Sequence, residues 1–373
     1  MAGRKGLAFI TVALALLAAP APALAISSSP ASSWQTNGRV RAIAVAAGKV
    51  FIGGDFTSVR APGASSGGVA RMHLAAFSLT TGKLMPWNPR ANGTVTALRV
   101  NPAGTTIYVG GGFSTLGGKA RAHIGAVTTS RSTIRKWHAG TNGTVYGIAV
   151  SSTRVYFGGS FSKVKGFNRT RLAAVGTSST APVTAWRANP NSTVRALTIS
   201  PSGKRVFVGG DFTRVNGRAH DHLVAVFTAG GLSPFRAHPS WPVTSLRNNA
   251  TTLVVGGGGN GGHIAAYVSA SGSRKWLTVT DGDVQGVALL GGTVIVGGHF
   301  NNYCVGGTGT GNPLVCNTPT ARRKALSLSL ATGKLGGWDP DVVGSTIGVS
   351  AVAAANGVEI GGAFTKVHGV SQQ

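Results

Sequence analysis

The stretch Phe51-Ile52-Gly53-Gly54-Asp55-Phe56 is the first of seven copies of one signature, an aliphatic or aromatic run that closes on Gly-Gly-x-Phe. The fifth copy keeps both glycines but has Gly258-Gly259 in place of x-Phe. A period of roughly 40 to 50 residues indicates a repeat architecture, for which a β-propeller is a leading candidate. The first glycines of the seven copies are Gly53, Gly110, Gly158, Gly209, Gly256, Gly297 and Gly361.

Each repeat is interpreted as four β-strands. The first begins with Val-x-small-aliphatic, as in Val145-Tyr146-Gly147-Ile148, and its small third residue suits an innermost strand crowded against a ring axis. The signature closes the second strand, and an apolar run such as Leu172-Ala173-Ala174-Val175 forms the third. Four strands joined alternately by short turns and long loops are typical of a propeller blade. The fourth strand ends in an aromatic residue, namely Trp87, Trp137, Trp186, Phe235, Trp276 or Trp338.

With these motifs, residues 34–370 resemble the delta-60 repeat β-propellers, secreted bacterial proteins whose blades carry Gly-Gly-x-Phe, a following Ala-Ala strand and a terminal tryptophan. The resemblance implies an all-β, seven-bladed β-propeller of four-stranded blades over residues 26–373. It implies little about activity, because this family is not tied to one reaction or ligand.

The seventh repeat has its first two strands and then stops at Gln373, without a recognisable third or fourth strand. Trp34 stands in the phase of a fourth strand, so an N-terminal strand is one candidate to close the last blade. No segment clearly supplies the third strand. We therefore expect either an incomplete last blade or a chain that belongs to a longer protein.

Residues 1–25 have the pattern of a secretory signal peptide. Arg4 and Lys5 precede an apolar run over residues 7–19, and the small-residue pattern Ala23-Leu24-Ala25 follows. The run is shorter than the roughly 18 to 20 residues that a membrane-spanning helix needs. We expect cleavage after Ala25, no membrane span afterwards, and a secreted protein that is extracellular or on a bacterial cell surface.

The chain is strongly basic, with 35 Lys and Arg against 8 Asp and Glu and a formal net charge of +27. Such a field favours anionic partners. Because the basic residues form no tail or block, no specific nucleic-acid binding is predicted. We expect a monomer whose partner is an anionic polysaccharide or cell-wall polymer, or a protein. Surface charge that only keeps the protein soluble is the alternative.

Basic residues recur just before the third strand of the repeats, and equivalent positions in a ring would form a circle on one face. This basic circle would attract phosphate, sulfate or carboxylate groups, with Arg pairing bidentately and His charging at mildly acidic pH. The alternative is that these side chains cap blade edges or bond loop carbonyls. The circle comprises Arg71, His73, Arg121, His123, Arg169, Arg171, His220, His222, His263, Arg322 and Lys324.

Neither a cofactor nor a metal site is predicted. Histidines stand in register in four repeats, but Arg171 and Lys324 replace them elsewhere, and the carboxylates that commonly support metal-binding histidines are scarce. Asp281 with Asp283 is a close pair in a loop between repeats, where aspartate is an ordinary turn residue; glycosidase chemistry needs two carboxylates placed across a sugar.

No residue is therefore predicted to be catalytic, and a non-catalytic binding or scaffold propeller is the preferred interpretation. Two alternatives stay open. One is an enzyme, a lyase or a carbohydrate-active enzyme, with its site at the central opening. The other is a structural module of a longer surface protein.

Two further local patterns lead to predictions. Cys304 and Cys316 are the only cysteines, and in an exported protein they predict a disulfide. Asn92, Asn142 and Asn191 match glycosylation sequons, yet they recur at one phase between repeats, so turn chemistry explains them without a glycan.

Overall fold

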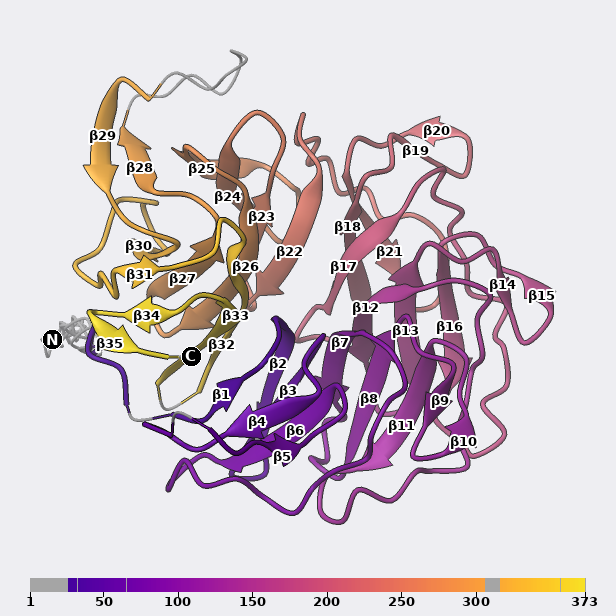
Figure 1. The fold of residues 1–373 in the computed structure, drawn as a ribbon. Coiled ribbons are helices and arrows are strands. Elements are labelled where there is room, and N and C mark those ends of the chain that lie inside the picture. Colours follow the sequence, from indigo (N-terminus) through magenta and orange to yellow (C-terminus); the bar gives the residue numbers. More distant parts are fainter. Residues whose placement is uncertain (1–25, 32, 65, 306–315, 356, 373) are drawn as a thin grey trace, which may run out of the picture.

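The computed structural model describes residues 26–31, 33–64, 66–305, 316–355 and 357–372. The predicted signal peptide over residues 1–25 lies outside them. Within this part of the chain every regular element is a β-strand, as Figure 1 shows. The search for a helix that is long and apolar enough to cross a membrane finds none among these residues.

The innermost strands of the repeats stand around a common axis (Figure 1). Each contacts the inner strand of the next repeat, and the last one, β32, contacts the first, β2, so the circle closes. Six of the seven begin at the valine of Val-x-small-aliphatic, which confirms the predicted inner strand. These strands are β2 (Val40–Ala46), β7 (Val95–Val100), β12 (Val145–Val150), β17 (Val194–Ile199), β22 (Val243–Asn248), β26 (Val284–Leu290) and β32 (Gly348–Ala354).

A second strand pairs antiparallel with each inner strand and ends at the second glycine of the signature, or one residue later in the seventh repeat. The register shifts by one residue after the leading valine, for example between Val145 and Gly147, which marks a β-bulge. The second strands are β3 (Lys49–Gly54), β8 (Thr106–Gly111), β13 (Arg154–Gly159), β18 (Arg205–Gly210), β23 (Thr252–Gly257), β27 (Thr293–Gly298) and β33 (Val358–Ala363).

A third strand pairs with the second in the first six repeats. Among the described residues, the predicted fourth strand is fully formed only in the fifth repeat, as β25 (Arg274–Thr280), which has strands hydrogen-bonded on both of its sides. In the five other complete repeats a single bridge replaces it, such as Phe77 with Leu84, since no further strand supports its outer edge. The third strands are β6 (Leu74–Ser78), β11 (Ile124–Thr128), β16 (Leu172–Gly176), β21 (Leu223–Phe227), β24 (Gly262–Val268) and β30 (Ala325–Ser329).

Short hairpins interrupt the connections that leave the second strands. Two short strands between the repeats, β1 (Gln35–Thr36) and β31 (Val342–Val343), extend the first and last hairpins, and β28 also pairs with β25. The hairpins are β4 (Ser58–Arg60) with β5 (Val69–Ala70), β9 (Thr115–Leu116) with β10 (Lys119–Ala120), β14 (Lys163–Val164) with β15 (Phe167–Asn168), β19 (Arg214–Val215) with β20 (Arg218–Ala219), β28 (Asn302–Val305) with β29 (Thr318–Ala321), and β34 (Lys366–Val367) with β35 (Val370–Ser371).

Close packing explains why the signature contains two glycines. A Cβ on the first glycine would meet the leading valine of the next repeat, at 2.2 Å from Val194 Cγ1 in the case of Gly158. A Cβ on the second would meet the carbonyl before its own repeat's bulge, at 1.9 Å from Thr144 O in the case of Gly159. Gly361 lies against Val40 of the first repeat in the same way, since an added Cβ would be 2.6 Å from Val40 Cγ1, and this contact brings the two ends of the ring together.

The aromatic residue that ends each repeat lies buried between neighbouring sheets. Trp137, for example, meets Tyr108 edge-on with ring centroids 4.9 Å apart, and its Nε1 donates a hydrogen bond to Gly176 O at the end of the next repeat's third strand. In the fifth repeat, which lacks the signature phenylalanine, Trp241 is buried and stacks on His263 at 5.1 Å. Each interface between repeats is thus an apolar core of its own.

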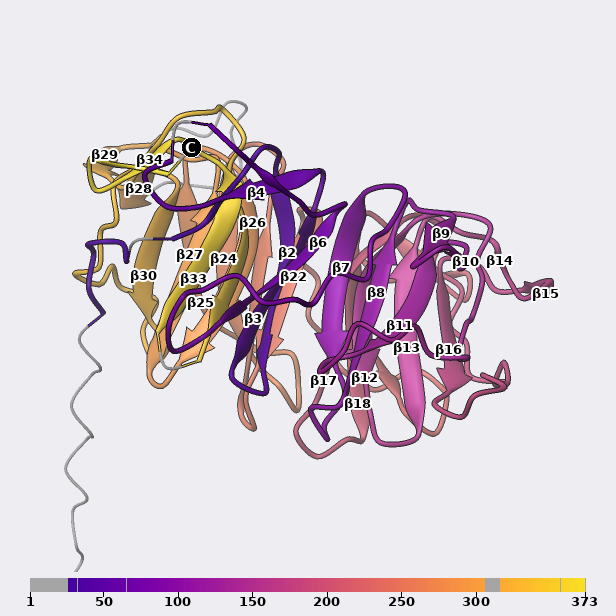
Figure 2. The same ribbon diagram turned by 60° about the horizontal axis from the view of Figure 1, so that its bottom comes forward.

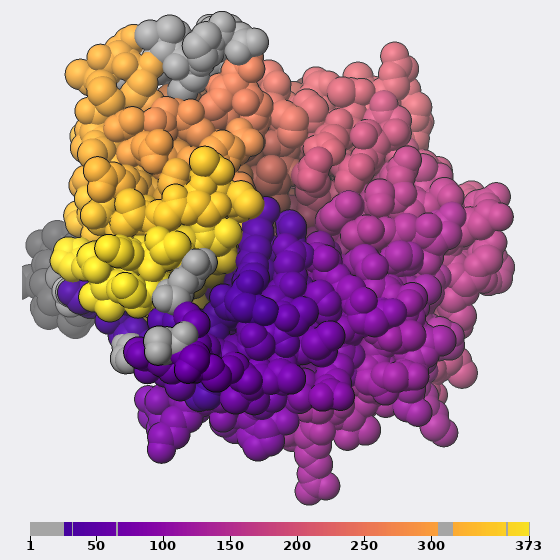
Figure 3. Space-filling view, viewed as in Figure 1, coloured from indigo at the N-terminus to yellow at the C-terminus, as the bar shows by residue number. Residues whose placement is uncertain are grey.

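The N-terminal segment covers the last repeat, whose own sheet contains only β32 and β33. Ser27 O accepts a hydrogen bond from Trp338 Nε1 at 3.1 Å, the role that the end of a third strand has elsewhere, and Ile26 packs into the same apolar cluster as Ile360. Trp34 packs on Phe77 with ring centroids 6.3 Å apart. Figure 3 shows the C-terminal residues in yellow lying against the N-terminal residues in indigo.

The prediction for Trp34 is therefore refined. This residue packs where the terminal tryptophan of the last repeat would stand, but residues 26–31 and Trp34 have no strand assigned, so this cover is made by side-chain packing and single hydrogen bonds. The signature copy of this repeat also differs from the others, because Glu359 takes the position of Phe51, Tyr108 and Tyr156. Burial raises the pKa of Glu359 above its usual value.

Replacing Glu359 with leucine is expected to raise the free energy of unfolding at pH 7 by about 1 kcal/mol, because an apolar side chain replaces a half-buried carboxylate. A raised pKa in the folded state means that the wild type loses stability as pH rises from the unfolded pKa through the folded one. The advantage of Glu359→Leu should therefore shrink below about pH 4.5, where the carboxyl is protonated in both states. Urea titrations at pH 7 and pH 4 measure it. A gain that is equal at both pH values would contradict this account, and Glu359→Gln separates the charge from the packing.

Candidate functional site

The long connections of the repeats and the hairpins lie on one face, here called the loop face. In Figure 2 the labels β4, β9, β10, β14, β28, β29 and β34 run along its edge. The disulfide predicted between Cys304 and Cys316 is present in this region, with 5.0 Å between the two Cα atoms, and it ties β28 to the residues that precede β29.

The outer arginines of the basic circle make hydrogen bonds within their own repeats. Nη1 of Arg71, Arg121 and Arg169 donates to the carbonyl of the preceding residue, at 2.9, 2.7 and 2.8 Å respectively. Their Nη2 atoms donate to a carbonyl beyond the third strand, such as Arg135 O at 2.8 Å from Arg121. Arg322 also bonds the preceding carbonyl and pairs with Asp339 at 3.1 Å. Such hydrogen bonds are expected if the arginines cap blade edges or bond loop carbonyls, which is the alternative to a ligand-binding role.

The inner members of the circle have left-handed backbones, with φ between 60° and 65°. Nδ1 of His73, His123 and His222 donates to the second signature glycine's carbonyl, at 3.0, 3.3 and 3.1 Å. Arg171 donates to Ser160 O, and Lys324 Nζ donates to His299 O at 3.1 Å. Each of these side chains therefore holds the loop that follows a signature.

The two remaining histidines of the circle have different surroundings. His220 stacks on His238 with ring centroids 6.0 Å apart. Burial, and next the charge of His238, lowers the pKa of His220. His263 is only 3% exposed beneath Trp241. The side chains of the basic circle thus differ in their access to solvent.

The loop-face hairpins carry a further set of cations at more exposed positions. Lys119 on β10, Lys163 on β14, Arg218 on β20 and Lys366 on β34 are all exposed. The four ion pairs found among the described residues are Arg41 with Asp55, Arg195 with Asp211, Arg322 with Asp339, and Arg323 with Asp341. Lys119, Lys163, Arg218 and Lys366 take part in none of them.

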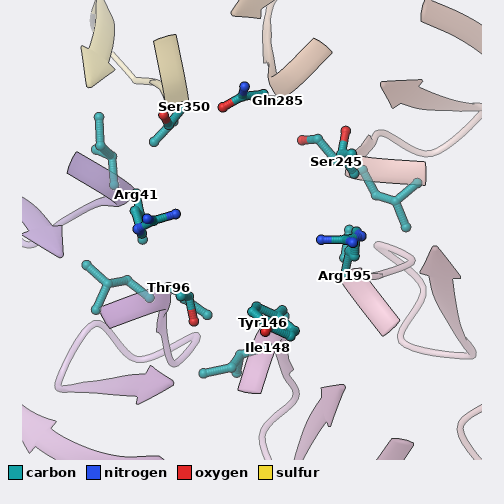
Figure 4. Close-up of a pocket in the computed structure, with 18 of the residues that line it drawn as sticks. Arg41, Thr96, Tyr146, Ile148, Arg195, Ser245, Gln285 and Ser350 are labelled. Carbon is teal, nitrogen blue, oxygen red and sulfur yellow. The ribbon is translucent and has the colours of Figure 1, made fainter. Parts of the chain in front are cut away.

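A cavity of about 130 Å³ lies on the ring axis, lined by the inner strands. Figure 4 shows that its walls carry Arg41, Thr96, Tyr146, Arg195 and Ser245, among others. Arg41 Nε bonds both Asp55 oxygens, at 2.9 and 2.8 Å, and Arg195 Nε bonds Asp211 Oδ1 at 2.6 Å. The residues x of two signatures, Asp55 and Asp211, therefore neutralise the arginines on their own inner strands.

Two further arginines line the same cavity, Arg99 on β7 and Arg247 on β22. Sequence reasoning did not single them out. The sequence feature that could have pointed to them is an arginine four residues after the leading valine of the inner strand. The other repeats have alanine or threonine at this position. The lining of this cavity contains neither histidine nor carboxylate. In the described part of the chain, no three His, Cys, Asp or Glu side chains are placed to hold a metal ion.

Comparisons with known proteins identify the fold. The crystal structure of the WD40 β-propeller domain of Doa1 is similar with a TM-score of 0.58 at 12% identity, covering 89% of this chain and 93% of that chain. The crystal structure of the computationally designed Ika8 protein is similar with a TM-score of 0.54 at 16% identity, covering 89% and 96%. No protein-family model and no curated protein matches the sequence. The chain therefore has a WD40-like β-propeller fold.

Proposed function

We propose that this protein is a secreted, seven-bladed propeller of the delta-60 repeat type that binds an anionic cell-envelope polymer without catalysing a reaction. The ligand lies across the loop face, over the basic circle and the exposed hairpin cations. In this proposal the side chains of the basic circle mainly stabilise the loops, because they bond loop carbonyls. The hairpin cations make the contacts.

The exposure of the hairpin cations supports the proposal most directly. Lys119, Lys163 and Arg218 are exposed on successive hairpins of adjacent repeats, and none of the eight acidic residues is paired to them in the described part of the chain. A row of cations on separate rigid blades matches a ligand with repeated negative charges. A single small anion would not reach all three.

Changing Lys119, Lys163 and Arg218 together to serine is expected to weaken binding to heparin, used as a model polyanion, by roughly 100-fold. Each cation near an anionic surface contributes about 1 kcal/mol, and 1.4 kcal/mol is a factor of ten. Calorimetry at low salt measures the difference. Wild-type affinity should also fall as salt rises, since exposed charges are screened.

The matched control changes Lys83, Lys204 and Lys334 to serine. These lysines are equally exposed but lie on the tight turns of the opposite face, so the variant loses the same net charge. Equal weakening by both triple variants would show that only the overall charge matters and would refute a loop-face site. Teichoic acid in place of heparin tests the proposed polymer class with the same pair of variants.

A further inference from the structure

The central cavity contains positive charge that the protein does not neutralise. Arg99 and Arg247 both line it, each near the end of its inner strand and away from the loop face. Arg247 Nη1 donates to Leu246 O at 2.9 Å. Neither guanidinium takes part in the four ion pairs among the described residues.

The charges of the other two arginines of the cavity are neutralised by carboxylates. Arg41 and Arg195 each occur with an aspartate at residue x of the same repeat's signature, and each is paired to it. Arg99 and Arg247 stand three positions further along their inner strands, opposite Tyr108 and Val254 of the second strands, at the end away from residue x. Residue x therefore cannot supply a carboxylate to this second pair of arginines, and no carboxylate lines the cavity around them.

The surroundings make this lack of a partner costly. Burial lowers the pKa of Arg99. Burial, followed by the charge of Arg99, lowers the pKa of Arg247 to about 10. Both side chains remain charged at neutral pH, and they repel each other across a space whose lining contains no anion. An anion that entered the cavity would meet two guanidiniums and would relieve this repulsion.

We propose that the far half of the central cavity binds a small oxyanion of the phosphate or sulfate class between Arg99 and Arg247. Guanidinium groups bind such oxyanions through paired, charge-assisted hydrogen bonds. The cavity, of about 130 Å³, is large enough for a tetrahedral ion of this kind. This site is separate from the loop face.

Thermal unfolding in inorganic phosphate tests the site, with potassium chloride at the same ionic strength as the reference. Wild-type Tm should rise and then follow the logarithm of phosphate concentration, by about 2 °C at ten times Kd. The variant Arg99→Met/Arg247→Met should not show this rise, although its Tm in chloride should equal or exceed that of the wild type. Arg99→Lys/Arg247→Lys keeps the charge but loses the planar fork, so its phosphate affinity should fall about tenfold.

Absence of a phosphate-specific shift in the wild type would overturn the proposal, as would an equal shift in the methionine double variant. Isothermal titration of phosphate into each protein provides a readout that does not depend on stability. The heparin experiment keeps the two sites distinguishable. The methionine variant should retain heparin binding, whereas Lys119→Ser/Lys163→Ser/Arg218→Ser should retain the phosphate response.

Discussion

Replacing Gly158 with alanine is expected to lower the free energy of unfolding by about 3 kcal/mol, because overpacking of a rigid core costs typically 1–3 kcal/mol or more. The new Cβ would lie 2.2 Å from Val194 Cγ1 and 2.9 Å from Leu197 Cδ1, both on the inner strand of the next repeat. Val194 is fully buried and β-branched, so it cannot turn away. Denaturant unfolding of purified protein measures the loss.

Two companion variants show whether this contact is the cause. Gly292→Ala adds the same methyl group where no atom lies within 4 Å, and it should change stability by less than about 0.5 kcal/mol. Val194→Ala combined with Gly158→Ala removes Val194 Cγ1, the nearest colliding atom, and leaves Val194 Cβ at 2.7 Å, so the double variant should be more stable than the sum of the two single changes predicts. If Gly158→Ala costs no more than Gly292→Ala, close approach of the repeats does not explain the signature.

Trp186→Ala is expected to cost about 3 to 5 kcal/mol, the range for large aromatic residues in cores. The indole is 4% exposed, meets Tyr156 edge-on with centroids 4.9 Å apart, and donates from Nε1 to Phe227 O at 2.7 Å. The change therefore leaves a cavity between two repeats and removes one of the two hydrogen bonds that Phe227 O accepts, the other coming from Gly230 N at 2.9 Å. Loss of the cooperative thermal transition at 37 °C, or a large drop in Tm, is the expected readout.

Trp186→Phe separates packing from hydrogen bonding at the same place. Phenylalanine already stands at the corresponding position of the next repeat, as Phe235, which is 3% exposed. The cost should therefore be near 1 kcal/mol, that of one hydrogen bond. A Trp186→Ala variant no less stable than Trp186→Phe would show that the tryptophan does not carry the interface.

Scaffold residues could be predicted from the sequence because the repeat multiplies each weak local signal. The turn role of the asparagines is an example: Asn142 Oδ1 accepts hydrogen bonds from the backbone of Ser162 and Lys163 at 2.9 and 2.8 Å, and Asn92 and Asn191 do the same in their repeats. The buried tryptophans and the leading valines of the inner strands could be predicted from the sequence for the same reason.

The rest depends on contacts that the repeat pattern does not contain. The cover of the last repeat uses Ile26 and Ser27, two residues without a repeat counterpart, and fourth strands require a neighbour that only β25 has. The basic circle was visible as a pattern, but the carbonyls that its side chains bond become identifiable only once the chain is folded. Arg99 and Arg247 can be recognised as a pair only in the folded structure, where both line one cavity between the inner strands.

The contact between Gly361 and Val40 has a consequence for how the protein is made. The first six repeats can dock in order as they emerge during synthesis, but the final interface joins residues from opposite ends of the sequence. Such a long-range contact must overcome loop-closure entropy before it contributes stability. One apolar surface therefore stays uncovered during synthesis until the last repeat reaches the first, and that surface is the one a chaperone would have to shield.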